Sequence, residues 1–210
     1  MVVEIAAVSI AVLHSLAPDH YLPITALGKA RKWSLKKTLF LAFLVSTIHV
    51  SFSIVIGFFT YLGLNLIGFA ERIESSIPLL LIIFGLAYAL ISLLKPHHHA
   101  HSATTTSILL ILGLSPCIPL IPIMLAASSV HQMFIVAVLF SAFTIGTIVT
   151  LTYLSYKAIK PPELHGKEDV FGGVIIAITG AISYLLTRKI RSFNIKTPEA
   201  VKYELHVQAS

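Results

Sequence analysis

A polar cluster lies inside the first apolar stretch of the chain, at His14-Ser-Leu-Ala-Pro-Asp-His20. It brings the imidazoles of His14 and His20 and the carboxylate of Asp19 into a segment that is otherwise apolar. An ionised Asp near the centre of a bilayer costs about 2.5–3.5 kcal/mol even on insertion scales, so its presence there indicates a function. Imidazole nitrogens together with a carboxylate oxygen suit Ni²⁺, Co²⁺ or Zn²⁺ better than Mg²⁺ or Ca²⁺.

Two prolines accompany the cluster. Proline has no amide hydrogen, and its ring clashes with the carbonyl four residues earlier. We therefore expect Pro18 to free the carbonyl of His14 and Pro23 to free that of Asp19. Within a bilayer, freed carbonyls must be satisfied by protein, water or an ion. Both prolines thus predict an interrupted helix that exposes polar groups.

The interruption also decides where the two imidazoles point. On a continuous helix, His14 and His20 would point about 120° apart, because each residue turns the helix by about 100°. A break at Pro18 lets them converge, and His49 lies near the middle of the next apolar stretch, from where it can reach the same point. The predicted metal ligands are His14, Asp19, His20 and His49.

Plainer interpretations exist for each of these residues. His14 and His49, taken singly, are typical of histidines that form hydrogen bonds between helices. Asp19 and His20 can instead lie at the membrane interface, hydrated beside the basic segment that follows. The combination of these residues with the two prolines favours the metal site.

Composition places the chain in a membrane. Apolar residues make up 56% of it and charged residues 11%, and the mean hydropathy is +0.90. A soluble domain carries roughly twice that charged fraction. The net charge of +6 comes from basic residues beside apolar runs, without the interleaved aromatics typical of nucleic-acid binding, so no nucleic-acid partner is expected. The single cysteine excludes an intramolecular disulfide and a two-thiol relay.

Six stretches reach or approach the roughly 20 apolar residues that a transmembrane helix needs. The charged residues Glu71, Arg72 and Glu74 separate the second stretch from the third. We predict an all-α integral membrane protein with one membrane domain, residues 1–210. Its parts are a three-helix repeat (1–94), a His-rich loop (95–106), a second repeat (107–187) and a polar C-terminal tail (188–210). The six stretches are 2–27, 38–67, 77–94, 107–127, 134–156 and 171–186.

The two halves share a pattern. Leu16-Ala-Pro-Asp19 matches Leu114-Ser-Pro-Cys117, and Ser46-Thr-Ile-His49 matches Ser141-Ala-Phe-Thr144. Three helices per half invert the second half, and proline-interrupted segments at matching positions indicate a transporter's substrate site. We therefore predict inverted repeats with helices 1 and 4 broken at prolines. Cys117 fits either a small buried hydrophobe or a pathway group. The predicted helix-break and pathway residues are Pro18, Pro23, Ser46, Pro116, Cys117, Pro119, Ser141 and Thr144.

Basic residues give conflicting signals about orientation. Residues 28–37 hold several Lys and Arg, which favours a cytoplasmic first loop and an external N-terminus. With six spans, the basic residues 188–202 would then lie outside. Of the two signals, the basic residues of the first loop are favoured.

A run of histidines follows the third stretch. Histidine-rich tracts can gather metal ions loosely, although a solvated polar loop without a role is the alternative. The possible metal-capture loop consists of His97, His98, His99 and His101.

The cluster His14-Ser-Leu-Ala-Pro-Asp-His20, followed by a basic loop and His49, resembles the NicO-type nickel/cobalt transporters. That family includes the urease-accessory-type nickel permeases, whose first span carries a similar His-x-x-x-Pro-Asp-His signature. The segment Gly113-Leu-Ser-Pro-Cys-Ile-Pro119 is similar to the family's Pro-Cys segment. The resemblance implies six spans and a divalent metal substrate bound by His14, Asp19, His20 and His49.

The expected function is secondary transport of Ni²⁺ or Co²⁺ across the cell membrane by a multi-pass protein. No phosphate-binding Gly-x-x-x-x-Gly-Lys-Ser/Thr motif is present. Proton coupling is natural because histidine must be deprotonated to bind a metal. We expect no enzyme activity and no resident cofactor, with the lipid bilayer, the metal substrate and a homo-oligomer or accessory protein as partners. The alternatives are an exporter of a small anion such as sulfite, which Asp19 would repel, and a thiol-electron carrier, which the single cysteine disfavours.

Overall fold

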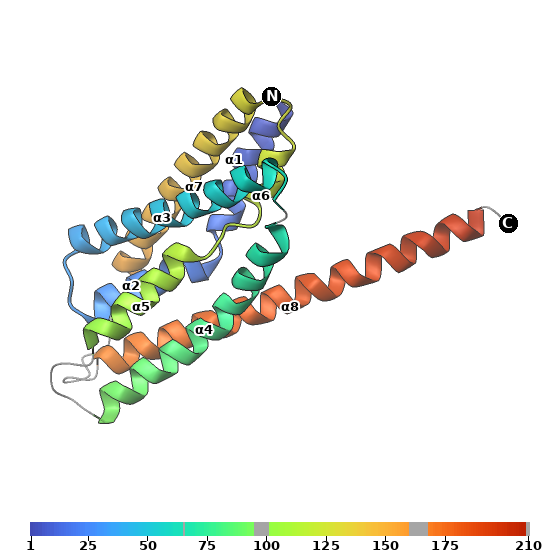
Figure 1. The fold of residues 1–210 in the computed structure, drawn as a ribbon. Helices are drawn as coiled ribbons and strands as arrows, with labels where there is room; N and C mark the ends of the chain where they lie inside the picture. The colour runs from blue at the N-terminus through green and yellow to red at the C-terminus, as the bar shows by residue number, and fades with distance from the viewer. Residues whose placement is uncertain (65, 95–100, 160–167, 209–210) are drawn as a thin grey trace.

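The computed structural model of the chain describes residues 1–64, 66–94, 101–159 and 168–208, with side chains except at 101–105, 187 and 190–208. Within these ranges the regular structure is helical, with no strand (Figure 1). The polar tail predicted for 188–210 is helical as far as Gln208 and projects away from the other helices (Figure 1). The helices are α1 (Val2–Ser15), α2 (Pro18–Ala30), α3 (Leu35–Tyr61), α4 (Ile67–Leu94), α5 (His101–Leu114), α6 (Leu120–Leu125), α7 (Val130–Ala158) and α8 (Glu168–Gln208).

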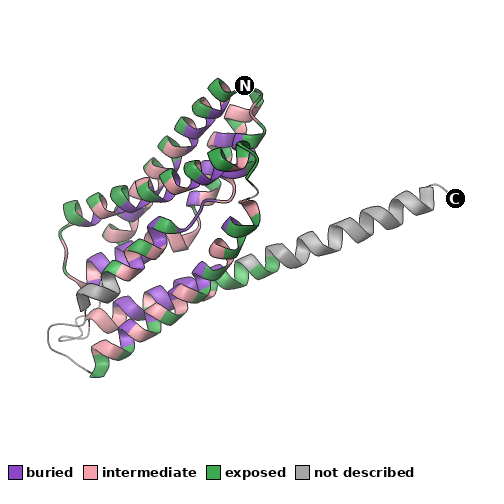
Figure 2. Ribbon diagram, in the orientation of Figure 1, coloured by how far each residue is buried: buried purple, intermediate pink, exposed green. Residues whose placement is uncertain are grey.

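Several of these helices can cross a membrane. Among the residues that the structure describes, four segments are long and apolar enough: α3, α4, α7 and residues Glu168–Leu186 of α8. The pair α1 and α2, bent by 45°, gives a fifth if it forms one span. Exposed faces alternate with buried ones around these helices, and many exposed side chains are large and apolar (Figure 2). The chain is therefore an all-helical multi-pass membrane protein with four to five candidate spans among the described residues.

The predicted break in the first span occurs between α1 and α2. Ala17 is extended, with φ −60° and ψ 128°, and Pro18 opens α2. A residue before proline avoids the helical region, and proline fits the first turn of a helix because no amide is needed there. The prediction that the His14 carbonyl is free is wrong, since it accepts the Ala17 amide at 3.1 Å. Pro23 lies inside α2 without ending it.

The predicted break in the second half occurs between α5 and α6. Helix α5 ends at Leu114, and α6 begins at Leu120 with Pro119 at its N-cap. Pro116 and Pro119 lie in the connecting segment, so a helical break is present at both of the positions that the sequence pattern matched.

The boundary between the second and third apolar stretches differs from the prediction. Helix α3 ends at Tyr61, and Gly63 then adopts φ 96°, a left-handed conformation that favours glycine. Because α4 starts at Ile67, Glu71 and Glu74 lie within its first turns and not in a loop. Glutamate is a good helix former, so charge alone did not indicate a helix end.

At one end of the bundle, polar contacts join α2 and α4 to the start of α8. Tyr88 donates its hydroxyl to Asp169 Oδ1 at 2.5 Å, and Arg31 Nε lies 3.6 Å from the same oxygen. Lys32 Nζ contacts Glu168 at 2.9 Å, and this hydrogen-bonded ion pair raises the pKa of the Lys32 ammonium. The contacts fix the C-terminal end of α2, the helix that begins beside the polar cluster.

Small residues let α4 and α8 pack closely. A Cβ built on Gly173 would lie 2.7 Å from both the Ala89 nitrogen and the Gly85 oxygen. A Cβ on Gly180 would lie 2.7 Å from the Pro78 oxygen. The backbones of α4 and α8 therefore approach too closely for a side chain, which requires glycine. Such close approach is typical of helix pairs in membranes.

We expect Gly173→Ala to destabilise the protein by about 1–3 kcal/mol, the usual cost of overpacking, because backbone atoms of α4 must move. Gly146→Ala is the matched control, since nothing lies within 4 Å of its Cβ position. Thermal unfolding in detergent should show a lower midpoint for Gly173→Ala only. Equal midpoints for the two variants would contradict the packing shown for α4 and α8.

Candidate metal site

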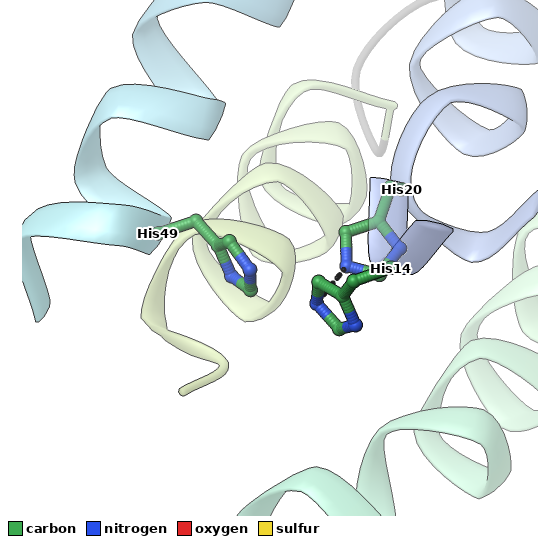
Figure 3. Close-up of side chains that lie close together, drawn as sticks. All are labelled: His14, His20 and His49. Atoms are coloured by element: carbon green, nitrogen blue, oxygen red, sulfur yellow. Dashed lines mark hydrogen bonds between the residues drawn. The ribbon is translucent and has the colours of Figure 1, made fainter. Parts of the chain in front are cut away.

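Three histidines from three helices converge at the break of the first span. His14 comes from the last turn of α1, His20 from the first turn of α2 and His49 from the middle of α3. One nitrogen from each ring lies within 4.8 Å of the others, and the rings point toward one another (Figure 3). The ring centroids of His14 and His20 are 4.5 Å apart, and those of His20 and His49 are 5.3 Å apart. The predicted convergence of the histidines is present.

His20 is held between Asp19 and His14. Its Nδ1 lies 3.0 Å from Asp19 Oδ1, and its Nε2 lies 3.1 Å from His14 Nε2. An ionised carboxylate only accepts, so Nδ1 of His20 carries hydrogen and the neutral ring has its lone pair on Nε2. The network thus assigns His20 the tautomer that turns a lone pair toward the other histidines.

His49 is oriented by the second broken segment. Its Nδ1 lies 3.1 Å from the Ser115 hydroxyl, which donates its own hydrogen to the Leu112 carbonyl at 2.9 Å. A hydroxyl has one hydrogen, so it must accept from Nδ1, and the lone pair of neutral His49 lies on Nε2. That Nε2 is buried and has no hydrogen-bond partner among the described residues. A buried polar atom without a partner is costly, and a metal ion would satisfy it.

Asp19 stands behind His20 and outside the group of three nitrogens. A carboxylate that accepts from the far nitrogen of a metal-binding histidine fixes the ring and raises its basicity. This geometry fits a supporting role for Asp19, and direct ligation by its carboxylate stays a prediction.

A cavity of about 940 Å³ opens beside the histidines. Helices α1 to α5, the segment between α5 and α6, and α7 and α8 contribute to its wall. Three carboxylates and one guanidinium line it, a net charge of −2 with the histidines neutral. The cavity therefore favours a cation over an anion. These charged lining residues are Asp19, Glu71, Glu74 and Arg72.

The predicted pathway residues are divided. Ser46, Pro116 and Pro119 line the cavity, whereas Pro18, Pro23, Ser141 and Thr144 are not among its lining residues. Cys117 is fully buried in an apolar cluster, and its amide donates to Ser53 Oγ at 2.6 Å. It packs as a small hydrophobe, the first of the two interpretations left open.

The histidine-rich loop lies mostly outside the described residues. His97, His98 and His99 fall in the undescribed segment, and His101 starts α5 without a described side chain. Metal capture by this loop stays a prediction.

Two site residues were missed at the sequence level. Ser115 precedes Pro116 in the second break, and its polar side chain in an apolar segment was the signal that could have identified it. Glu74 was interpreted as a charge separating two spans, and only the position of α4 brings it to the cavity wall.

Comparison of the chain with protein families, with curated proteins and with solved structures finds no match. What the chain does is therefore inferred from its own residues and their geometry.

Proposed function

We propose that this protein is a secondary transporter of a divalent transition-metal cation, Ni²⁺ or Co²⁺, in the cell membrane. The observation that carries the proposal is the convergence of His14, His20 and His49 at a helix break inside a membrane protein. Imidazole suits the divalent ions of the later first-row metals, and a mobile cargo requires a site reached from a cavity.

The donor atoms support the proposal. His20 and His49 each have Nδ1 occupied, by Asp19 and by Ser115, so that the lone pair of each neutral ring lies on Nε2. His14 supplies the third nitrogen. Three nitrogens leave room for water or a carboxylate on the metal, which suits an ion that must bind and leave.

The charge of the cavity favours a cation as the substrate over a small anion, which is the substrate in the alternative function. The cavity's net charge of −2 would repel sulfite or a sulfonate. The thiol carrier is disfavoured as well, because the single cysteine is buried in an apolar cluster.

Six spans arranged as two inverted repeats belong to the same proposal. In this arrangement α1 with α2 forms the first span, and α5 with α6 forms its counterpart. The support is that both pairs break at a proline-containing segment and that both breaks reach the same site, one through His14 and the other through Ser115.

Proton coupling follows from the donors. A proton and a metal compete for the lone pairs of His14, His20 and His49, so binding of the metal is favoured where protons are scarce. This chemistry favours exchange of the metal for protons, with the proton gradient as the energy source.

Purified protein in liposomes tests the proposal. We expect Ni²⁺ and Co²⁺ to enter faster than in protein-free liposomes, as followed with an enclosed metal-sensitive dye, and an acidic lumen to accelerate entry. If the rate of metal entry does not depend on the pH gradient, the hypothesis of proton coupling is wrong. No metal entry, with sulfite entry instead, would overturn the cation transporter.

A further inference from the structure

The wall of the cavity holds two carboxylates whose role the histidine site does not explain, and Glu74 is the less exposed of them. Glu74 lies in the second turn of α4 and is half-buried. It lines the same cavity as His14, His20 and His49. A carboxylate in a membrane-spanning helix is costly unless it has a partner or a function.

The described residues provide no partner for this carboxylate. Arg72, the cation nearest along α4, donates through Nε to the Gly68 carbonyl at 3.1 Å. None of the ion pairs among the described residues includes Glu74. Asp19, by contrast, is already bound to His20. Glu71 and Glu74 are therefore the carboxylates of the cavity that are available to a cation, and Glu74 is the less exposed of the two.

Burial along α4 places Glu74 between the surface and the interior. Glu71 and Arg72 are exposed, Glu74 is intermediate, and Ile77 and Pro78 are buried, and all of them line the cavity. A cation that enters along α4 meets Glu74 after it leaves the exposed rim.

The histidine site itself indicates that a second negative charge is needed. His49 is 4% exposed, and its unpartnered Nε2 faces the other two histidines (Figure 3). Three neutral imidazoles and one supporting carboxylate leave a divalent ion with one uncompensated positive charge. In a low-dielectric interior such a charge is expensive. A second carboxylate in the same cavity removes that cost.

We infer that Glu74 is a cation-binding residue of this cavity, the carboxylate that receives the divalent ion and neutralises it beside His14, His20 and His49. This inference rests on the proposed function and adds a residue on a fourth helix to the site. The site then combines nitrogen donors with an anionic oxygen donor, a set typical of transition metals.

Calorimetric titration with Ni²⁺ alone tests the inference on purified wild type, Glu74→Gln and Glu74→Asp. We expect Glu74→Gln to raise the Kd by more than about tenfold, because even the loss of a carboxylate that only supports a ligand costs 10–100-fold. Glu74→Asp keeps the charge and should recover most of the affinity. Glu168→Gln is the charge-matched control, because Glu168 pairs with Lys32 at the polar contacts between α2 and α8.

The outcomes separate this inference from the proposed function. If wild type binds Ni²⁺ and Glu74→Gln binds it equally well, Glu74 has no role in binding and the inference is overturned. Equal losses in Glu74→Gln and Glu74→Asp would also overturn it, because charge would not be the cause. If wild type binds no Ni²⁺, it is the proposed function that fails.

Discussion

Replacing His49 by alanine should weaken Ni²⁺ binding by more than about 100-fold, as measured by calorimetric titration of the purified protein. The substitution removes one of the three converging nitrogens, and the loss of a direct ligand exceeds the 10–100-fold cost of losing an outer partner. His49 contributes the nitrogen that is best prepared for a metal, because Ser115 fixes its tautomer and the described part of the chain offers Nε2 no partner. Flux of Ni²⁺ into liposomes should fall with the affinity.

The alternative for His49 is a helix–helix hydrogen bond with Ser115 and nothing more. In that case His49→Ala would lower the unfolding midpoint and leave the Ni²⁺ affinity unchanged. His131→Ala is the matched control, because His131 is exposed at the start of α7, outside the three-histidine group. If the His49→Ala protein folds and binds Ni²⁺ with wild-type affinity, α3 contributes no ligand to the site.

The sequence predicted the first half of the site well because its signals are local. Pro18 permits few backbone conformations for Ala17, so the break followed from stereochemistry. Once the break is granted, His14 and His20 can converge, as the structure confirms. The all-helical multi-pass character followed from composition for a similar reason, because apolar surface in such excess requires lipid.

The contributions from distant segments could not be predicted in the same way. Ser115 reaches His49 only because the segment between α5 and α6 packs against α3, 66 residues away along the chain. Glu74 lines the cavity because of where α4 packs. In the sequence, its charge indicated a boundary between two spans. The His14 carbonyl was expected to be free because proline removes one donor, yet the Ala17 amide supplies another.

The two broken segments have different roles at one point of the molecule. The first break presents His14 and His20 as donors, while the second presents a hydroxyl that sets the tautomer of His49. Matching backbone patterns in the two halves thus support unlike side-chain chemistry. In the two-fold arrangement that we propose, the first half supplies the donors and the second half supplies the orienting group.

Asp19→Asn should lower the Ni²⁺ affinity by about 10–100-fold, the range found when the carboxylate behind a metal-binding histidine is removed. Asparagine keeps the size of the side chain and an oxygen that can accept from His20 Nδ1. The histidines should therefore stay in place, and the effect should come from the lost charge. That charge lowers the cost of a divalent ion in the cavity.

The same variant distinguishes a cation transporter from an anion transporter. Loss of one carboxylate makes the cavity less negative, so sulfite entry into liposomes should stay the same or increase if the protein carries anions. For a metal transporter, Ni²⁺ entry should decrease while sulfite entry stays at the level of protein-free liposomes. Glu168→Gln, which removes a carboxylate far from the histidines in the chain and paired with Lys32, should leave Ni²⁺ entry unchanged. Faster sulfite entry with unchanged Ni²⁺ binding in Asp19→Asn would favour the anion transporter, because only an anion benefits from the removal of this negative charge.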